Sequence, residues 1–203
     1  MTSADRPYLS VVVTCRNDDH GGSPVARLQA FVNTFNAQCL RTSLDAEVIV
    51  VEWNPPGDRP SLKDVLRWPA QPACRFRIIN VPPDVHGTLQ FSDTLPLFQM
   101  IAKNVGIRRA AGQFVLATNI DIVFSDELID FMAAKRLEIG RLYRVNRHDI
   151  ESQFPADADP LAQMAYCRSH HLRIHRQSGS YPVAADGSFL LGEICESDRI
   201  PRL

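Results

Sequence analysis

Two polar side chains, Asn119 and Asp121, follow the apolar run FVLAT of residues 114–118. Such a run is typical of a buried β-strand. A carboxylate at its end costs several kcal/mol to desolvate unless it is paired with a cation or bound to a metal. The pair therefore marks either a turn into solvent or a ligand site.

Two more apolar runs end in polar residues of the same kind. The run YLSVVVT leads into the turn RNDD, which contains Arg16 and Asp18, and the run EVIVVE ends with Glu52. The carboxyl ends of parallel strands meet at one edge of a sheet, and α/β proteins bind their ligands there. We therefore expect the side chains of Asp18, Glu52 and Asp121 to face one cleft.

The elements that must position these residues alternate along the chain. Buried strands are expected at residues 8–14, 47–52, 76–81 and 114–118. Helices are expected at residues 24–39, 61–67, 94–111 and 125–136, with Ser23, Thr94 and Ser125 as N-caps and Gly112 as a C-terminal stop. This βαβαβαβ order predicts an α/β fold with a Rossmann-like, mostly parallel sheet flanked by helices.

After Gly140 the pattern is weaker. The expected elements are a strand at 142–145, a loop at 154–160 and a helix at 161–174. His171 and His175 have the spacing of one helix face, but no glutamate completes an HExxH zinc motif. A solvated or phosphate-contacting basic face is the favoured interpretation. The length of 203 residues predicts a single domain over residues 1–203.

The composition of the whole chain disfavours several classes of protein. A net charge of −1 provides no global field for nucleic acid or an anionic membrane. The five cysteines are scattered without CxxC spacing, which disfavours structural zinc and fits reduced thiols in a cytoplasm. The sequence has no signal peptide and no apolar run of roughly 20 residues, so we expect a cytoplasmic chain without a transmembrane segment. The dinucleotide-binding GxGxxG, P-loop and GxSxG hydrolase motifs are absent.

Three segments, in this order, resemble the family 2 glycosyltransferases of the GT-A fold over residues 9–131. LSVVVTCRND is similar to that family's opening strand, and EVIVVEWNPPGD is similar to its second strand, which ends in an acidic residue. AKNVGIRRAAGQFVLATNID is similar to the segment that ends in the family's DxD motif. The resemblance implies a GT-A-like fold in which residues 8–131 form the half that binds a nucleotide-diphosphate sugar.

The resemblance also implies roles for individual residues. Asn119 and Asp121 would hold Mn²⁺ or Mg²⁺, which neutralises the charge on the departing diphosphate. Because the two residues alternate on an extended segment, their side chains are expected on the same side. Asn119 departs from the family's first Asp, so Asp121 is the more direct ligand. The residues implied in nucleotide binding are Thr14, Arg16, Asp18, Glu52, Lys103 and Asn104.

Sugar transfer also needs a base for the acceptor hydroxyl. Asp186 is the positional candidate for this base, and Glu193 and Glu196 are alternatives. The expected function is metal-assisted transfer of a sugar from a nucleotide-diphosphate donor to an unknown acceptor. Two alternatives stay open. One is a non-catalytic nucleotide-sugar-binding module, in which residues 141–203 form an incomplete acceptor half. The other is a nucleotidyltransferase, for which RNDDHGGSP lacks a convincing glycine-rich phosphate loop.

Overall fold

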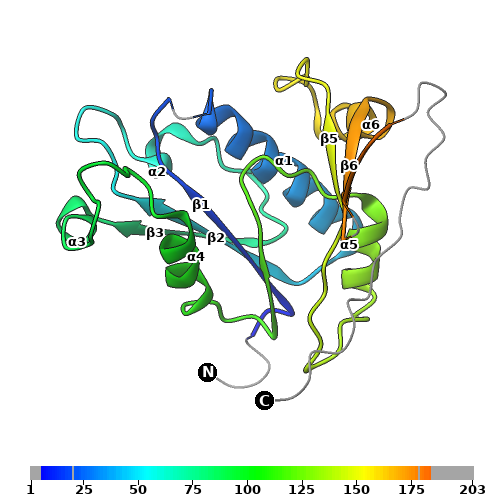
Figure 1. Cartoon of the computed structure of the whole chain (residues 1–203). Helices are drawn as coiled ribbons and strands as arrows, with labels where there is room; N and C mark the ends of the chain where they lie inside the picture. Colours follow the sequence, from blue (N-terminus) through cyan, green and yellow to red (C-terminus); the bar gives the residue numbers. More distant parts are fainter. Residues whose placement is uncertain (1–5, 20, 178, 184–203) are drawn as a thin grey trace. The chain divides into compact units, whose positions relative to one another are not determined.

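The chain forms two compact units in a computed structural model that describes residues 6–19, 21–177 and 179–183. The first, unit 1, is Met1–Ile122, and the second, unit 2, is Val123–Leu203. Figure 1 shows the helices and strands of both units in chain order. Each unit is described by itself below.

Unit 1 is a four-stranded parallel sheet flanked by helices. Its strands are β1 (Leu9–Cys15), β2 (Ala46–Trp53), β3 (Arg75–Val81) and β4 (Phe114–Ala117). Its helices are α1 (Pro24–Thr42), α2 (Leu62–Val65), α3 (Pro83–His86) and α4 (Gln99–Ile107). The strand order is β3-β2-β1-β4, and all three pairings are parallel. The predicted mixed α/β class and parallel sheet are therefore confirmed, and the arrangement is compatible with a Rossmann-like fold.

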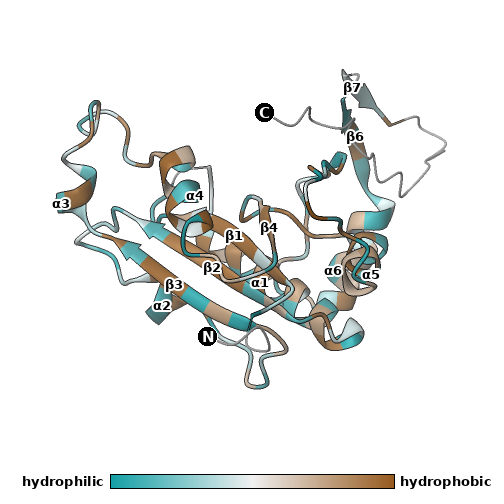
Figure 2. Cartoon of the chain, turned by 90° about the horizontal axis from the view of Figure 1, so that it is seen from below, coloured by the Kyte–Doolittle hydropathy of each residue, from teal (hydrophilic) through white to brown (hydrophobic). Residues whose placement is uncertain are grey.

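The two central strands form the core of unit 1. Every residue of β1 and β2 is buried, and both strands are mostly hydrophobic in Figure 2. Uninterrupted β-branched runs give such strands, because a parallel sheet is covered on both faces. On one face, Val12, Val51 and Trp53 pack against Ala102 of α4. Helix α1 lies on the other side of the sheet (Figure 1).

Helix α4 is shorter than predicted at both ends. It begins at Gln99 rather than after Thr94, because Pro96 disfavours helical backbone at the residue before it. It ends at Ile107, so Gly112 is not its C-terminal stop. The helix lies so close to the sheet that a Cβ added to Gly106 would stand 2.5 Å from Val12 Cγ1. Glycine is required there by packing rather than by backbone conformation.

A buried polar network holds the amino-terminal ends of the strands together. Glu47 Oε1 accepts hydrogen bonds from Ser10 Oγ at 2.6 Å and from the Ala111 amide at 2.7 Å. Its Oε2 accepts one from Arg77 Nη1 at 2.9 Å. Ser10 Oγ in turn accepts from the Gly112 amide at 2.8 Å. Burial alone would raise the pKa of Glu47, but these donors outweigh burial and the pKa lies below its usual value.

Unit 2 contains a three-stranded antiparallel sheet of order β5-β6-β7 and two helices. Its elements are α5 (Asp126–Ala133), β5 (Arg147–Ile150), α6 (Pro160–Ser169), β6 (His171–Arg176) and β7 (Gly179–Pro182). The predicted cap of α5 is confirmed, since Ser125 Oγ accepts from the Leu128 amide at 3.3 Å. The expected strand at 142–145 is wrong, because β5 begins at Arg147.

The expected helix at 161–174 is also wrong in its second half. Asp159 caps α6, and the helix ends at Ser169. Residues 171–176 then form β6, which pairs with β5 on one side and β7 on the other. His171 and His175 therefore lie on a strand and not on a helix face. The helix interpretation failed because cross-strand partners outside the segment, such as Asp149 for His175, are invisible to a local pattern.

Candidate functional site

The order of the strands creates one place in unit 1 where a ligand site is expected. From β1 the chain continues to β2 and β3 on one side, and then returns to place β4 on the other side of β1. The carboxyl ends of β1 and β4 therefore lie at a switch point of the topology, where open α/β sheets bind ligands. We use the term carboxyl edge for the residues that follow β1, β2 and β4 on this side of the sheet.

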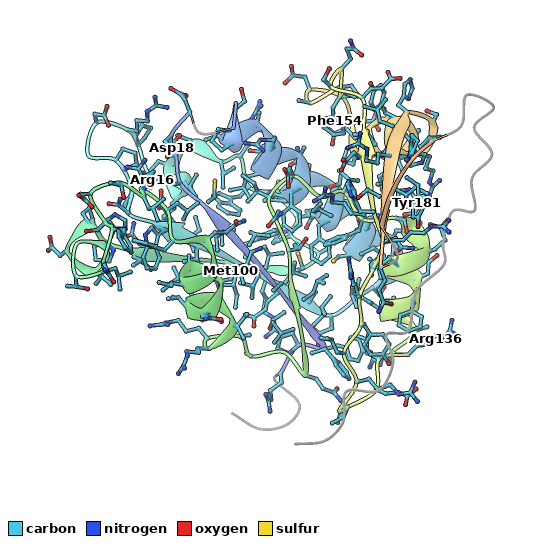
Figure 3. All side chains as sticks on the ribbon, in the orientation of Figure 1. Arg16, Asp18, Met100, Arg136, Phe154 and Tyr181 are labelled. Carbon is cyan, nitrogen blue, oxygen red and sulfur yellow. The ribbon has the colours of Figure 1, made fainter. Side chains whose placement is uncertain are left out.

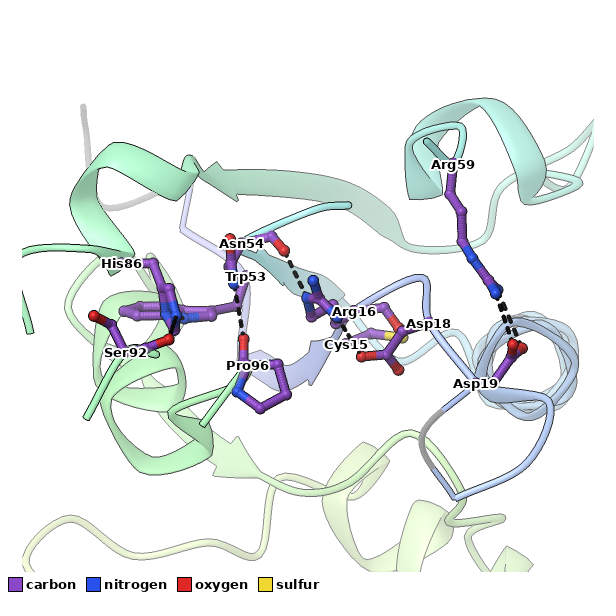
Figure 4. A network of polar contacts seen from close by, with 10 residues as sticks. All are labelled: Cys15, Arg16, Asp18, Asp19, Trp53, Asn54, Arg59, His86, Ser92 and Pro96. Carbon is purple, nitrogen blue, oxygen red and sulfur yellow. Dashed lines mark hydrogen bonds and ion pairs between the residues drawn. The ribbon is translucent and has the colours of Figure 1, made fainter. Parts of the chain in front are cut away.

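The turn after β1 brings two predicted residues to the carboxyl edge. Arg16 Nη1 pairs with Asp18 Oδ2 at 2.6 Å, and Arg16 Nε donates to the Asn54 carbonyl at 2.7 Å (Figures 3 and 4). Neighbouring Asn17 is buried and donates to the Pro60 carbonyl at 2.8 Å. Arg16 thus connects the ends of β1 and β2 through one guanidinium group.

A second set of contacts, which was not predicted from the sequence, braces the end of β2. Trp53 Nε1 donates to His86 Nδ1 at 2.8 Å, and His86 Nε2 lies 3.0 Å from the Ser92 carbonyl (Figure 4). His86 is therefore the neutral tautomer that carries its proton on Nε2. Asn54 has a left-handed φ of 46° and donates through Nδ2 to the Pro96 carbonyl at 3.1 Å. These contacts fix the segment before α4 against β2.

Glu52 lies at the end of β2 as predicted, but its side chain is buried. Its Oε1 accepts from the Leu62 amide at 2.7 Å, at the start of α2, and its Oε2 from Asn80 Nδ2 at 3.4 Å. Burial raises the pKa of Glu52, and the two hydrogen bonds offset this only in part. The carboxylate therefore anchors the loop that leads from β2 to α2.

Asn119 is bonded to helix α4. Its Oδ1 accepts from Lys103 Nζ at 2.7 Å and from Gln99 Nε2 at 3.0 Å, two donors that stand one helical turn apart. Strand β4 ends at Ala117, and Asp121 lies in a turn. The expectation that Asn119 and Asp121 alternate on an extended segment is therefore wrong.

Asp121 is paired with helix α1 instead. Its Oδ2 lies 3.4 Å from Arg27 Nη1, and the two side chains are 44% and 34% exposed. The guanidinium of Arg27 also lies against Gly21, whose added Cβ would stand 3.1 Å from Arg27 Nη2. Burial lowers the pKa of Lys103, and the charge of Asp121 offsets part of that shift. Asp121 thus interacts with a cation from each of the two helices.

The predicted metal site can be compared with this set of oxygens. Asn119 Oδ1 already accepts two hydrogen bonds, one of them from an ammonium group. A divalent cation at that oxygen would lie beside the charge of Lys103, which opposes its binding. In residues 6–19, 21–177 and 179–183, no group of three or more His, Cys, Asp or Glu side chains is placed to hold a metal ion. Asn119 does not fit the role of metal ligand in this arrangement, and Mn²⁺ or Mg²⁺ binding stays a prediction.

Asn104 lies exposed on α4. Asp186, Glu193 and Glu196, the candidate bases, lie outside the described residues.

The histidine-rich strand of unit 2 has a polar arrangement of its own. His175 Nε2 lies 2.7 Å from Asp149 Oδ2, and His175 Nδ1 lies 2.7 Å from Ser180 Oγ. The contact with His175 holds the pKa of Asp149 below its usual value. His175 and Ser180 are direct partners in the β6–β7 register, so these bonds are the cross-strand contacts of a small sheet.

Comparisons with known proteins add no family to this description. No protein-family model and no curated protein matches the sequence. The functional interpretation therefore depends on the geometry of the carboxyl edge. A separate finding concerns membranes: among the helices in the described part of the chain, none has the length and apolar character to span a bilayer.

Proposed function

We propose that unit 1 binds a nucleoside-diphosphate sugar at its carboxyl edge, and that the protein transfers the sugar to an acceptor hydroxyl as a GT-A-type glycosyltransferase. One observation carries the proposal. Arg16, Lys103 and Asp121 follow or cover different strands, yet all lie at the switch point between β1 and β4. Open parallel sheets bind nucleotides at such points.

The residues at the ends of β1 and β2 have two kinds of role in this proposal. Arg16 and Asp18 are half-buried polar groups that can contact the nucleoside directly. Glu52 is a positioning residue, because its carboxylate is buried against the Leu62 amide and acts through the loop that follows β2. Transfer also requires a base for the acceptor hydroxyl, and Asp186 remains the candidate for it.

Nucleotide-sugar binding without transfer is the second candidate function. It is favoured by Asn119, which stands where the resemblance expects a carboxylate and whose oxygen is already bonded to two side chains of α4. In that case the protein would hold the donor or present it to a partner.

The test is calorimetric titration of the purified full-length chain with a panel of nucleoside diphosphates and their sugars. We expect one nucleotide to bind, and Arg16→Ala to weaken its binding at least about tenfold through the loss of charge-assisted bonds. Arg75→Ala is the control, because Arg75 pairs with Asp45 at the opposite end of the sheet. If no nucleotide binds, or if Arg16→Ala binds as tightly as the original chain, the proposal is wrong.

A second measurement separates the two candidate functions. Release of nucleoside diphosphate is followed in the presence of a mixture of hydroxyl acceptors. Acceptor-dependent release that Asp186→Asn abolishes supports a transferase, whereas tight binding without release supports the binding module.

A further inference from the structure

Two cations from different helices meet the segment that follows β4. Lys103 of α4 bonds to Asn119, and Arg27 of α1 pairs with Asp121. Lys103 meets an uncharged amide oxygen here rather than a carboxylate. An anion at this place would give the ammonium group a charged partner.

Lys103 is the better placed of the two to bind such an anion. An ammonium group has three donors, and the described residues supply Lys103 with one hydrogen-bond acceptor, the amide oxygen of Asn119. An amide oxygen carries no formal charge, so the ammonium is partly desolvated without a close counter-ion. The lowered pKa of Lys103, caused by burial, is the expected consequence.

A second observation concerns the buried hydroxyl of Thr14, on the face of the sheet that α4 covers. Thr14 is 5% exposed, and in the described ranges its Oγ accepts and donates no hydrogen bond. Strand β1 pairs with β4 from Leu9↔Phe114 to Val12↔Ala117, and the Thr118 amide donates to the Val12 carbonyl, so Thr14 lies just beyond the last paired residues at the end of the sheet where Asn119 follows β4. Thr14 also shares the α4-covered face with Val12, because alternate strand residues point to one face. A buried hydroxyl without a partner destabilises the fold, and an anion beside it would supply the missing acceptor.

We propose that Lys103, Arg27 and the Thr14 hydroxyl bind the diphosphate of the donor directly, so that binding needs no divalent cation. Lysine acts on phosphate as a point charge, and arginine can offer two parallel donors to it. The identity of the anion as a nucleoside diphosphate rests on the proposed function. This proposal also explains why the oxygens around Asn119 do not suit a metal ion: the ammonium group of Lys103 supplies the positive charge that the metal would supply.

The same groups would act in the transfer step. When the bond between the sugar carbon and the diphosphate oxygen breaks, its electron pair stays on that oxygen. The acceptor oxygen forms the new bond to the sugar carbon, and its proton passes to a base. The charge that develops on the diphosphate is stabilised by Lys103 and Arg27, which are oriented before the reaction begins.

The test is calorimetric titration of the full-length chain with nucleoside diphosphates and with inorganic pyrophosphate, once in EDTA and once in Mn²⁺. We expect the affinity to agree within about twofold between the two conditions, because the charge of the ligand is met by side chains. Lys103→Met should weaken binding at least about tenfold, and Lys103→Arg should retain most of it. Lys63→Met, the same change at an exposed lysine of α2, is the matched control.

Thr14→Val separates binding from folding. Valine has the shape of threonine and lacks the hydroxyl that has no partner, so the melting temperature should not fall. Binding of pyrophosphate should still weaken by about threefold, the effect of one lost hydrogen bond. Unchanged affinity in both Thr14→Val and Lys103→Met would overturn the inference.

The outcomes also distinguish this inference from the proposed function. Binding that appears in Mn²⁺ and vanishes in EDTA would refute direct binding by side chains and leave the glycosyltransferase proposal standing. No binding of any nucleotide or of pyrophosphate in either condition would refute both.

Discussion

The two glutamates of β2 show how differently the two ends of one sheet are built. Glu47 and Glu52 are both buried, at 2% and 1% exposure, near opposite ends of the strand. The pKa of Glu47 is lowered because its donors outweigh burial, whereas the pKa of Glu52 is raised because burial prevails. In the same strand, hydrogen bonds thus stabilise the charge of one glutamate, whereas burial opposes the charge of the other.

The same contrast extends to the residues around each glutamate. At the amino end, Ser10 and the Ala111 and Gly112 amides complete a closed set of hydrogen bonds around Glu47. Near the carboxyl edge, the buried hydroxyl of Thr14 has no hydrogen-bond partner among the described residues, and Lys103 is matched with an uncharged oxygen. The closed end stabilises the fold, and the incompletely matched end is where binding energy can be gained.

The largest effect is expected when the packing around the amino-terminal end of the sheet is disrupted. A Cβ on Gly112 would stand 2.6 Å from both the backbone nitrogen and Oγ of Ser10. The backbone of Ser10 cannot move away without shifting β1, so Gly112→Val should lower the free energy of unfolding by about 4 kcal/mol or prevent folding. Gly57→Val is the control, because nothing lies within 4 Å of its added Cβ. Urea unfolding measures both variants, and equal stability would show that the amino end is not closely packed.

A smaller effect is expected from neutralising each glutamate in turn. Glu47→Gln turns an amide donor toward Arg77 and should cost about 2–3 kcal/mol, because the guanidinium loses its charged partner. Glu52→Gln retains an acceptor for the Leu62 amide and removes a buried charge, so its effect should stay within about 1 kcal/mol. Chemical denaturation of the two variants at neutral pH gives the difference, and equal losses would abolish the contrast between the ends.

The pH dependence of stability should differ in sign between these positions. Glu47 has a folded pKa below its unfolded value of about 4.5, so its contribution is complete above that pH and is lost as the pH falls through the folded pKa. Glu52 has a folded pKa above about 4.5, so its contribution is complete below that pH and is lost as the pH rises through the folded pKa. The free energy of unfolding is measured between pH 3 and 7 (a window set by roughly these pKa values). Glu47→Gln should show a smaller change of this free energy with pH than the original chain on the acidic side, and Glu52→Gln should show a smaller change on the neutral side.

The smallest effect is expected at the exposed carboxylate of the carboxyl edge. Asp121 is 44% exposed and its contact with Arg27 is 3.4 Å long, so Asp121→Ala should change the free energy of unfolding by less than about 0.5 kcal/mol. Thermal unfolding at moderate salt provides the measurement. A loss comparable to that of Glu47→Gln would make Asp121 a structural residue and remove the distinction between the two ends.

The sheet of unit 1 could be predicted because its signal is local. β1 and β2 contain the apolar runs 11–13 and 48–51, which are typical of strands buried on both faces of a parallel sheet. Arg16, Asp18, Glu52 and Asp121 were predicted near strand ends from the same runs, and their roles in ligand binding stay predictions. The elements of unit 2 were harder to predict. β5 and β6 are short, polar strands, and each is stabilised by pairing with the other rather than by its own sequence pattern.

The contacts within the candidate site could not be predicted from the sequence. Arg27 and Asp121 are 94 residues apart, and nothing in the local pattern of α1 distinguishes Arg27 from an exposed arginine of a helix face. The bond from Lys103 to Asn119 depends on where β4 ends, and one residue of difference changes the direction of every side chain beyond it. The sequence identifies residues that reach the edge, and tertiary structure decides which of them meet.

The bond between Trp53 and His86 gives the carboxyl edge an optical signal of its own. The protein has two tryptophans, and Trp53 is 1% exposed while Trp68 is partly exposed beside Phe76. A buried indole fluoresces at shorter wavelength than one in water, and hydrogen bonding to an imidazole alters its intensity. In a Trp68→Phe variant, the emission would come from Trp53 alone. Its colour and brightness would then report, without any label, when the segment before α4 separates from the end of β2.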